Sequence, residues 1–354
     1  MGYKNKKFRR IQPLTAFTVI VVSALVVFLI GVGIWKLKGA QNTSVTLSSG
    51  EELKYVGLVD GLGRPISGTI YFKNGISAKI DVSEGKVTYS DGTVYYGPLD
   101  ADYRKTGKGS ITLPNGDTYE GDFLEDTMTG YGKFTFASGD YYEGELQNGK
   151  KQGVGKYVST DGSVYEGDFK NDIRHGKGKH TAADGSVYEG DFKDDARTGK
   201  GSLTLPGGVR YEGDFVDGKK HGSGIMSWPG GNRYEGAFED DARTGVGVFI
   251  WASGQTCAGG FVRGLREGNA VLTYPDGSLY VGAYLHDKRH GDGVYIRADG
   301  KSERQKWNMG ELIASEPIGL WKDENADGGN ESNAKAAREV LDKTTTFTVR
   351  PINN

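Results

Sequence analysis

A five-residue phrase, aromatic-x-Gly-x-apolar, recurs along this chain at a nearly constant interval. The first interval is 24 residues, and every later one is 23 residues. A fixed period of this length predicts an array of small units, each of which can bury its apolar face only against its neighbours. The repeat therefore replaces the two or three globular domains that a chain of 354 residues would otherwise suggest. The phrases begin at Tyr95, Tyr119, Tyr142, Tyr165, Tyr188, Tyr211, Tyr234, Cys257 and Tyr280.

Two further patterns keep the same period. Gly-x-Gly pairs fall at Gly107/Gly109, Gly130/Gly132, Gly153/Gly155, Gly176/Gly178, Gly199/Gly201, Gly222/Gly224, Gly245/Gly247 and Gly291/Gly293, with Gly268-Asn269-Ala270 as a degenerate copy. Turn dipeptides that end in glycine fall at Asn115-Gly116, Ser138-Gly139, Asp161-Gly162, Asp184-Gly185, Gly207-Gly208, Gly230-Gly231, Ser253-Gly254, Asp276-Gly277 and Asp299-Gly300. Because glycine and asparagine tolerate a positive φ, these dipeptides predict tight primed hairpin turns.

The residues inside one repeat alternate with a period of two, as in a half-buried strand. Tyr165, Gly167 and Phe169 share one face, and Glu166 and Asp168 share the other. A second alternating strand follows each Gly-x-Gly pair, and its glycines would let a large ring lie flat over the backbone. The predicted fold is all-β: an elongated single-layer antiparallel sheet of stacked 23-residue β-hairpins.

The aromatic column is the candidate binding surface. A single-layer sheet has no second layer to cover its apolar face, so these rings either fill a concavity among themselves or remain partly exposed. An exposed strip would suit a peptide, a second array or a sugar chain. The residues of this possible partner-binding face are Tyr119, Tyr142, Tyr165, Tyr188, Tyr211 and Tyr234.

Ionisable residues also recur, but their spacing argues against metal binding and catalysis. Equivalent side chains of successive hairpins lie about 9.6 Å apart, too far for one column to ligate one ion. His175, His221 and His290 are two or three repeats apart, so they cannot share a metal. The outward acidic columns are better explained by solubility and by pairing with lysines across strands. They comprise Glu120, Glu143, Glu166, Glu189, Glu212 and Glu235, beside Asp122, Glu145, Asp168, Asp191 and Asp214.

Composition narrows the class of protein further. The formal charge is −2, from 44 basic and 46 acidic residues that are interspersed along the repeats, so we expect no nucleic-acid partner. The single cysteine, Cys257, excludes an intramolecular disulfide framework and stands where other repeats have tyrosine. We expect no cofactor, no metal and no enzymatic activity.

The amino-terminal region predicts a membrane anchor. Residues 14–35 are 22 consecutive residues without charge, enough for about 33 Å of helix across a hydrocarbon core of about 30 Å. The apolar run is too long for a cleaved signal peptide, which indicates an uncleaved signal-anchor. Five basic residues lie in the segment 1–13 before the helix, and Lys36 and Lys38 follow it, so the amino terminus is expected in the cytoplasm and the repeats outside it.

The remaining boundaries follow from where the period begins and fails. Residues 36–50 are small and polar and predict a flexible tether. Degenerate repeats are expected over 51–94, regular repeats over 95–301 and an apolar cap over 302–322. Residues 323–354 form a polar tail, expected to be partly disordered, with a short helix over 334–343 and a strand over 344–349.

The repeat also resembles a known family. Tyr-Glu-Gly-Asp-Phe begins at Tyr119, Tyr165, Tyr188 and Tyr211, and His-Gly-Lys-Gly and His-Gly-Ser-Gly begin at His175 and His221. These phrases are similar to the MORN (membrane occupation and recognition nexus) repeat. The resemblance implies a non-catalytic scaffold that binds partner proteins or itself, often beside membranes. Two alternatives remain open: a cell-envelope glycan-binding module, and a lipid-binding protein that bridges membranes.

Overall fold

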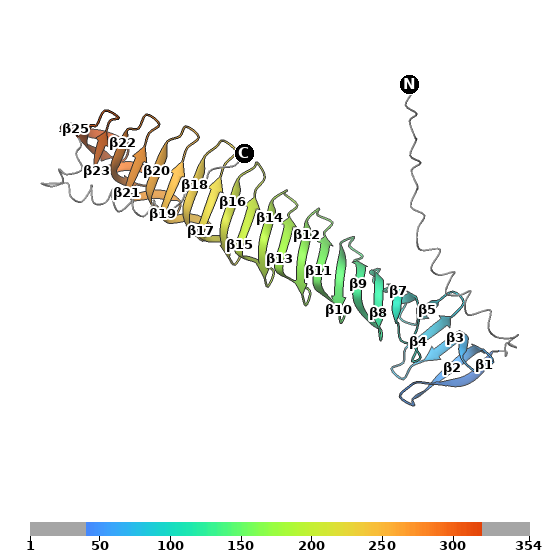
Figure 1. The fold of residues 1–354 in the computed structure, drawn as a ribbon. Helices are drawn as coiled ribbons and strands as arrows, with labels where there is room; N and C mark the ends of the chain where they lie inside the picture. The colour runs from blue at the N-terminus through green and yellow to red at the C-terminus, as the bar shows by residue number, and fades with distance from the viewer. Residues whose placement is uncertain (1–39, 321–354) are drawn as a thin grey trace, which may run out of the picture. The chain divides into compact units, whose positions relative to one another are not determined.

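The computed structural model describes residues 40–320, which form two compact units. The first holds the chain up to Arg104 together with Ile111–Pro114, and the second holds Lys105–Ser110 and the chain from Asn115. All regular elements of the described residues are β-strands (Figure 1). The basic segment, the predicted membrane helix 14–35 and the polar tail lie outside the described residues. Between residues 40 and 320 there is no helix long and apolar enough to cross a membrane.

The first unit begins with a strand where a tether was predicted. β1 (Gln41–Thr46) pairs along its whole length with β2 (Glu52–Val59), in a hairpin closed by a bond from the Leu47 amide to the Glu51 carbonyl. The expectation of an unpacked tether over 36–50 is therefore wrong for this part. The physical reason is that Val45 finds a buried site on the hairpin, which offsets the cost of ordering the polar residues around it.

The degenerate repeats retain the basic packing of the regular ones. β3 (Pro65–Tyr71), β4 (Ser77–Asp81), β5 (Lys86–Tyr89) and β6 (Val94–Tyr96) continue the antiparallel order of the first unit. Tyr55 is fully buried, and a Cβ added to Gly57 or Gly68 would lie within 2.6 Å of its hydroxyl. The ring-over-glycine arrangement thus extends upstream of the regular period.

The second unit is a run of antiparallel hairpins in chain order (Figure 1). From β9 to β24 each strand pairs with the strand before it and the strand after it. Its strands, after β7 (Gly107–Thr112), are β8 (Thr118–Leu124), β9 (Thr127–Thr135), β10 (Tyr141–Gln147), β11 (Lys150–Val158), β12 (Val164–Lys170), β13 (Ile173–Thr181), β14 (Val187–Lys193), β15 (Ala196–Thr204), β16 (Arg210–Val216), β17 (Lys219–Ser227), β18 (Arg233–Glu239), β19 (Ala242–Ile250), β20 (Thr256–Val262), β21 (Leu265–Thr273), β22 (Leu279–Leu285), β23 (Lys288–Ile296), β24 (Lys301–Asn308) and β25 (Glu311–Leu320).

The register places each tyrosine above a pair of glycines. Gly190 of β14 lies opposite Gly201 of β15, and Tyr188 points over both. A Cβ on either glycine would meet the tyrosine ring or hydroxyl at 2.6 Å, which is closer than any real contact. The Tyr188 hydroxyl then donates to the backbone carbonyl of Asp191 at 3.0 Å. The predicted packing of rings on glycine is confirmed.

The two glycines of a Gly-x-Gly pair have different tasks. The second, such as Gly201, makes room for the ring. The first, Gly199, has φ +56° and lies beside the register shift between Gly190 and Asp191, where a Cβ would also press on the Asp191 carboxylate at 2.7 Å. This is a β-bulge that requires a left-handed backbone conformation. The sequence pattern predicted the first task and missed the second.

The glycine-ending dipeptides do not form the primed turns that the sequence suggested. In the connection after β9, the Gly139 amide donates to the Phe136 carbonyl and the Phe136 amide donates to the Asp140 carbonyl, both at 2.9 Å. Only Gly139 of this three-residue loop has a positive φ, +97°. The expectation is therefore wrong in turn type: these are type I turns closed by a left-handed glycine, a common three-residue hairpin loop, except at Gly207-Gly208, where both glycines have φ +85°.

Two-residue connections of the primed type occur at the opposite end of the strands. Between β12 and β13, Asn171 and Asp172 have φ +51° and +72°, and they join the paired residues Lys170 and Ile173. The Asp172 amide donates to the carbonyl of Lys151 at 3.0 Å, and its carboxylate accepts the Lys151 amide at 2.9 Å. Each such turn thereby ties one repeat to the one before it.

We expect Asp172→Ala to lower the free energy of unfolding by about 2 kcal/mol. The change removes the carboxylate that accepts the Lys151 amide. It also leaves alanine at a left-handed backbone position, where its side chain cannot form the local hydrogen bonds that let Asp adopt this conformation. Asp172→Asn keeps the acceptor and tolerates the same φ, so it should cost much less. Urea denaturation of the full chain measures both. Equal losses for the two variants would contradict this role for the carboxylate.

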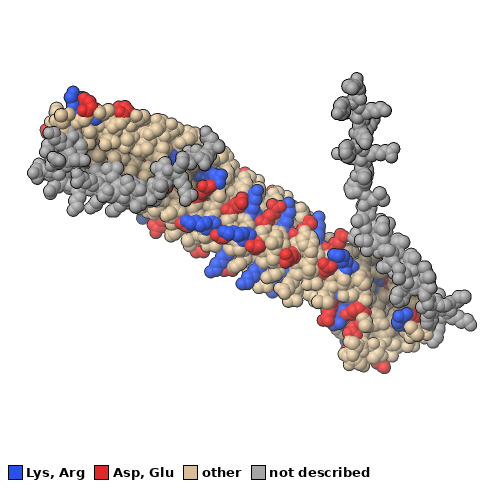
Figure 2. Space-filling model, viewed as in Figure 1, with Lys and Arg blue, Asp and Glu red and all other residues tan. Residues whose placement is uncertain are grey.

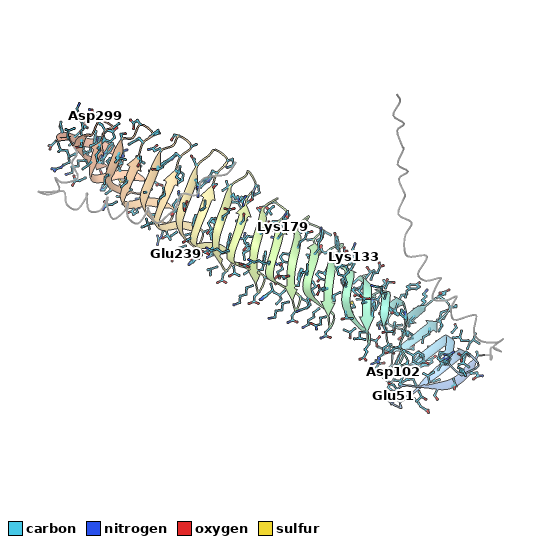
Figure 3. All side chains as sticks on the ribbon, in the orientation of Figure 1. Glu51, Asp102, Lys133, Lys179, Glu239 and Asp299 are labelled. Carbon is cyan, nitrogen blue, oxygen red and sulfur yellow. The ribbon has the colours of Figure 1, made fainter. Side chains whose placement is uncertain are left out.

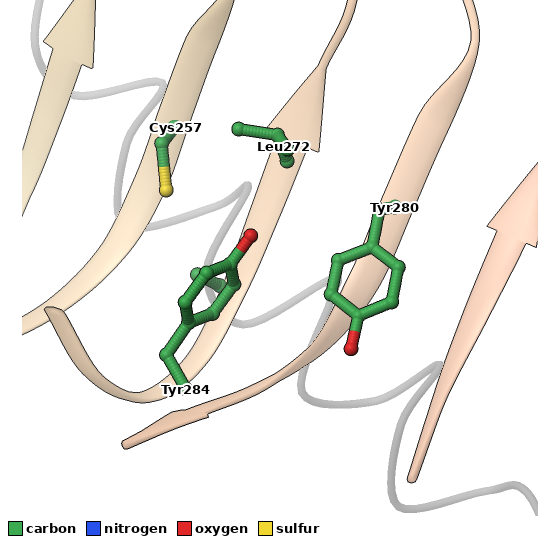
Figure 4. Packing of buried hydrophobic residues seen from close by; sticks show 5 residues of the cluster. Cys257, Leu272, Tyr280 and Tyr284 are labelled. Atoms are coloured by element: carbon green, nitrogen blue, oxygen red, sulfur yellow. The ribbon is translucent and has the colours of Figure 1, made fainter. Parts of the chain in front are cut away.

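The last hairpin extends the array instead of shielding it. Cys257, Leu272, Tyr280 and Tyr284 belong to one buried cluster near this end (Figure 4), which confirms Cys257 as a packed substitute for tyrosine. Trp307 of β24 packs against Tyr280 with centroids 6.1 Å apart, as the predicted cap requires. The rest of that prediction is wrong: four large apolar side chains of β25 remain exposed, because this strand has one described neighbour. They are Leu312, Ile313, Ile318 and Leu320.

Candidate interaction faces

The column of six tyrosines is the core of the array, not a binding surface. We call Tyr119, Tyr142, Tyr165, Tyr188, Tyr211 and Tyr234 the tyrosine ladder; each is between 0% and 3% exposed. Phenylalanines separate the rungs: the Tyr165 centroid lies 5.1 Å from both Phe169 and Phe192, with the rings edge to face. The predicted partner-binding role of these tyrosines is wrong, because neighbouring rings and glycine backbone occupy their surface.

A row of cations covers the edge of the ladder. Arg174 lies 5.6 Å from the centroid of Tyr165 and 5.4 Å from that of Phe192, at cation–π distance. The Asp195 carboxylate of the next primed turn accepts from its Nε at 3.0 Å. Sequence reasoning missed this row, although a basic residue stands nine positions after the first residue of every phrase from Tyr142 to Tyr280. Its members are Lys151, Arg174, Arg197, Lys220, Arg243, Arg266 and Arg289.

A partly exposed aromatic strip does exist on the ladder face, but other residues make it. The glycine-spaced strands carry half-buried rings beyond their glycines, and these rings contact one another along the array. Trp228 and Phe249 have centroids 5.6 Å apart, and Phe249 and Trp251 are 4.7 Å apart. Of the surfaces suited to stacking a sugar ring or peptide, this strip is accessible and the ladder is not.

The opposite face, which we call the outer face, carries the predicted charge pairs. Lys177 pairs with Asp191 at 2.6 Å, and Lys200 pairs with Asp214 at 2.6 Å. Cross-strand pairing of the outward carboxylates is confirmed. The lysines of these pairs are more than 70% exposed, so each pair contributes about 1 kcal/mol or less. Lys133 and Lys179 mark this face in Figure 3.

An open groove runs across the outer face of β12–β16. Glycine backbone, including Gly190 and Gly201, lines it between the charged rows. Figure 2 shows acidic and basic side chains mixed along the middle of the array. We call this surface the charged groove, and its charged lining residues are Glu166, Lys177, Lys179, Glu189, Lys200, Arg210 and Glu212.

The predicted histidine column has structural partners. The His221 carbonyl accepts from the Tyr211 hydroxyl at 3.4 Å, and Nδ1 of His290 accepts from the Met309 amide at 3.3 Å. Within residues 40–320, no three His, Cys, Asp or Glu side chains are grouped so as to hold a metal ion. The structure therefore does not bring His175, His221 and His290 together.

Burial of the ladder shifts its acid–base behaviour. Desolvation raises the pKa of the Tyr119, Tyr165 and Tyr188 phenols to about 12, from about 10 in an unfolded chain. A raised folded-state pKa means that stability is intact below pH 10 and is lost as pH rises towards 12. We expect ladder ionisation, followed by tyrosinate absorbance, to coincide with loss of β circular dichroism. Ionisation of the ladder phenols near pH 10 with the sheet intact would contradict the burial.

Ring ladder, repeated glycine pairs and two kinds of hairpin turn define an open, single-layer β-hairpin repeat protein. The MORN repeat family matches eight consecutive segments, 119–141, 142–164, 165–187, 188–210, 211–233, 234–256, 257–279 and 280–302. These segments cover more than half of the chain, which therefore belongs to the MORN repeat proteins. A search of curated proteins found no match.

Solved structures resemble the chain only distantly. The TCP domain of SAS-4 (dCPAP) of Drosophila melanogaster, in complex with a proline-rich motif of Ana2 (dSTIL), is 14% identical, with a TM-score of 0.25, over 56% of this chain and 88% of that one. The TCP10 domain of Danio rerio CPAP, in complex with a STIL peptide, is 14% identical, with a TM-score of 0.16, over 78% of this chain and 99% of that one. A streptogramin B lyase is 12% identical, with a TM-score of 0.14, over 77% of this chain and 88% of that one. Scores this low inform neither the fold nor the function.

Proposed function

We propose that this chain is a non-catalytic scaffold, anchored in a membrane by residues 14–35, whose array binds a protein partner along the charged groove. The observation that carries the proposal is the groove itself. It joins open glycine backbone to alternating Lys and Glu side chains whose own ion pairs are exposed and weak. A partner can replace such pairs at little cost.

The mixed charge of the groove favours a polypeptide over the other ligands considered. A polyanion such as nucleic acid would meet Glu166, Glu189 and Glu212 as well as the lysines. An extended peptide with both signs of charge can match both rows. The half-buried strip around Trp228, Phe249 and Trp251 is the surface on which the glycan-binding alternative would rest.

A photo-crosslinking amino acid at Lys179, on the groove, tests the proposal in cells that make the full chain. A matched probe at Leu62, an exposed turn residue of the first unit, is the control. We expect a discrete protein adduct at Lys179 and none at Leu62, identified by mass spectrometry. Adducts only with lipid or envelope polysaccharide at Lys179 would overturn protein binding and favour one of the alternatives.

The anchor and its direction can be tested separately. Cys257 is fully buried, so a cysteine introduced at exposed Ser49 supplies the reactive thiol. We expect the Ser49→Cys chain to stay in the membrane fraction and to react with an impermeant thiol reagent on intact cells, whereas a chain lacking residues 14–35 leaves the membrane fraction. Labelling only after cell lysis would place the repeats in the cytoplasm.

A further inference from the structure

The outer face changes character along the array. Its central row is charged in the first half, where Lys156 lies opposite Glu166 and Lys179 lies opposite Glu189. From β19 the same row becomes apolar without a gap, because each member lies opposite the next on the neighbouring strand. These residues are Val248, Ala258, Val271, Val281 and Val294.

The positions on either side of this row are also uncharged, except for Asp292 beside Val294 on β23. We call the whole surface the apolar outer patch, and it contrasts with the mixed charge of the charged groove. Figure 2 shows the same change, since the visible surface over β19–β23 is largely uncharged. The uncharged flanking members on the outer face are Val246, Ile250, Thr256, Gly260, Asn269, Thr273, Leu279, Ala283 and Ile296.

Three of the five residues of the central row are buried, although they face away from the ladder, and Val248 and Ala258 are half-buried. Val271 is 3% exposed, Val281 is 8% and Val294 is 2%. Lys179 and Glu189, at equivalent positions of the charged half, are exposed. Within residues 40–320 each strand packs mainly against its neighbours in the sheet, so those strands place no second layer over this face. Apolar sheet surface of this extent needs a cover.

We propose that the carboxyl-terminal segment of the same chain, residues 334–349, docks on the apolar outer patch. Its sequence is amphipathic, with one apolar side that could pack on the patch and one polar side that could face solvent. Helical spacing over 334–343 groups Ala337, Val340 and Leu341 on one side, with Lys335 and Arg338 directed elsewhere. The strand pattern that follows alternates, so that Phe347 and Val349 share a face.

The geometry of the chain allows this docking in cis. β25 ends at Leu320, which lies opposite Lys301 of β24. β24 is the strand next to the patch, so the described chain ends two strands beyond it. The patch spans five strands, or about 24 Å at the usual strand spacing. Residues 321–333 can extend about 43 Å, so they reach any part of it. A tethered segment also has an effective concentration far above that of a separate partner.

Docking of this segment would divide the outer face into two regions. The apolar half is covered by the chain itself, and the charged groove over β12–β16 stays open. Release of the segment would expose Val271, Val281 and Val294 together, a contiguous surface suited to self-association. The inference concerns a different surface from the charged groove and stands whether or not that groove binds a partner.

Thiol labelling of the full chain tests the docking. Val281→Cys places a thiol in the patch, and Lys179→Cys places one at an exposed position of the same central row in the charged half; buried Cys257 contributes little background. We expect Val281→Cys to react at least about tenfold more slowly than Lys179→Cys, because its labelling requires local opening. Adding Leu341→Glu should raise the Val281→Cys rate to within about twofold of the exposed control, while Lys335→Glu should leave it slow.

Three outcomes would overturn the proposal. Equal labelling of Val281→Cys and Lys179→Cys would mean that the patch is uncovered. Slow labelling that persists with Leu341→Glu would mean that another group covers it. Protection that disappears on dilution, together with a dimer-to-monomer change in mass, would assign the cover to a second copy of the chain.

Discussion

Replacing Gly201 with alanine is expected to destabilise the centre of the array by about 3 kcal/mol, although it adds a single methyl group to a sheet. The new Cβ would lie 2.6 Å from Cε2 of Tyr188, and Gly190 and its backbone close the other side of the site. Tyr188 is 1% exposed and wedged between Phe192 and Phe215, so its ring cannot move aside. To relieve this overlap, either the buried ring or the paired backbone must move, and both movements cost free energy in a close-packed core.

Two matched variants identify the cause of that loss. Ser202→Ala, at the next residue but on the outer face, should change stability by no more than about 0.5 kcal/mol. Tyr188→Ala removes the ring and should itself cost about 4 kcal/mol. Combining it with Gly201→Ala should cost less than the sum of the single changes, because the clash is gone. Strict additivity in urea denaturation would contradict the ring-over-glycine packing.

Removing one whole repeat is expected to leave a folded array, whereas removing half a repeat should abolish folding of the region. Deletion of 165–187 joins Val164 to Tyr188 and brings together strands whose contacts match those they replace. Stability then falls by roughly one repeat's share, as expected of a one-dimensional array. Deletion of 165–175 removes most of one strand and its primed turn, so the following strand would run in the wrong direction for its neighbour.

Circular dichroism and protease resistance of the two deletion chains measure this difference. The deletion of 165–187 should retain native-like β signal and a single protected core. The deletion of 165–175 should lose ordered structure on both sides of the junction. Similar behaviour of the two chains would show that the 23-residue unit is not the cooperative building block.

Much of the fold follows from the sequence because its period is simple. Alternation assigned Tyr165 and Phe169 to the buried face, and the glycine pattern correctly predicted rings on glycine backbone. The primed turns were missed at Asn171-Asp172, Asp194-Asp195 and Asp240-Asp241, which lack the glycine that usually marks them. The usual signal was present at Asn148-Gly149 and Asp217-Gly218, at the same positions of their repeats. Turn type is poorly specified when several residues tolerate a positive φ.

The candidate site was harder to predict, since exposure depends on neighbours that no single repeat reveals. The strand pattern alone does not show whether the Tyr188 ring is exposed. In the structure, Phe192 and Phe215, from two different hairpins, pack edge to face against it. The cation that lies above it, Arg197, comes from the next strand and is aligned only by the register. Column patterns predicted which residues share a face, and three-dimensional packing decided which face stays open.

Tyrosine nitration of the folded full chain, mapped by mass spectrometry, tests the central claim that the ladder is core and that partners must use other surfaces. We expect modification of Tyr71, Tyr96 and Tyr131, which are between 44% and 58% exposed. We expect Tyr188, Tyr211 and the other ladder tyrosines to stay protected until the chain is denatured. Modification of ladder tyrosines at a rate similar to that of Tyr131 in the folded protein would contradict this claim.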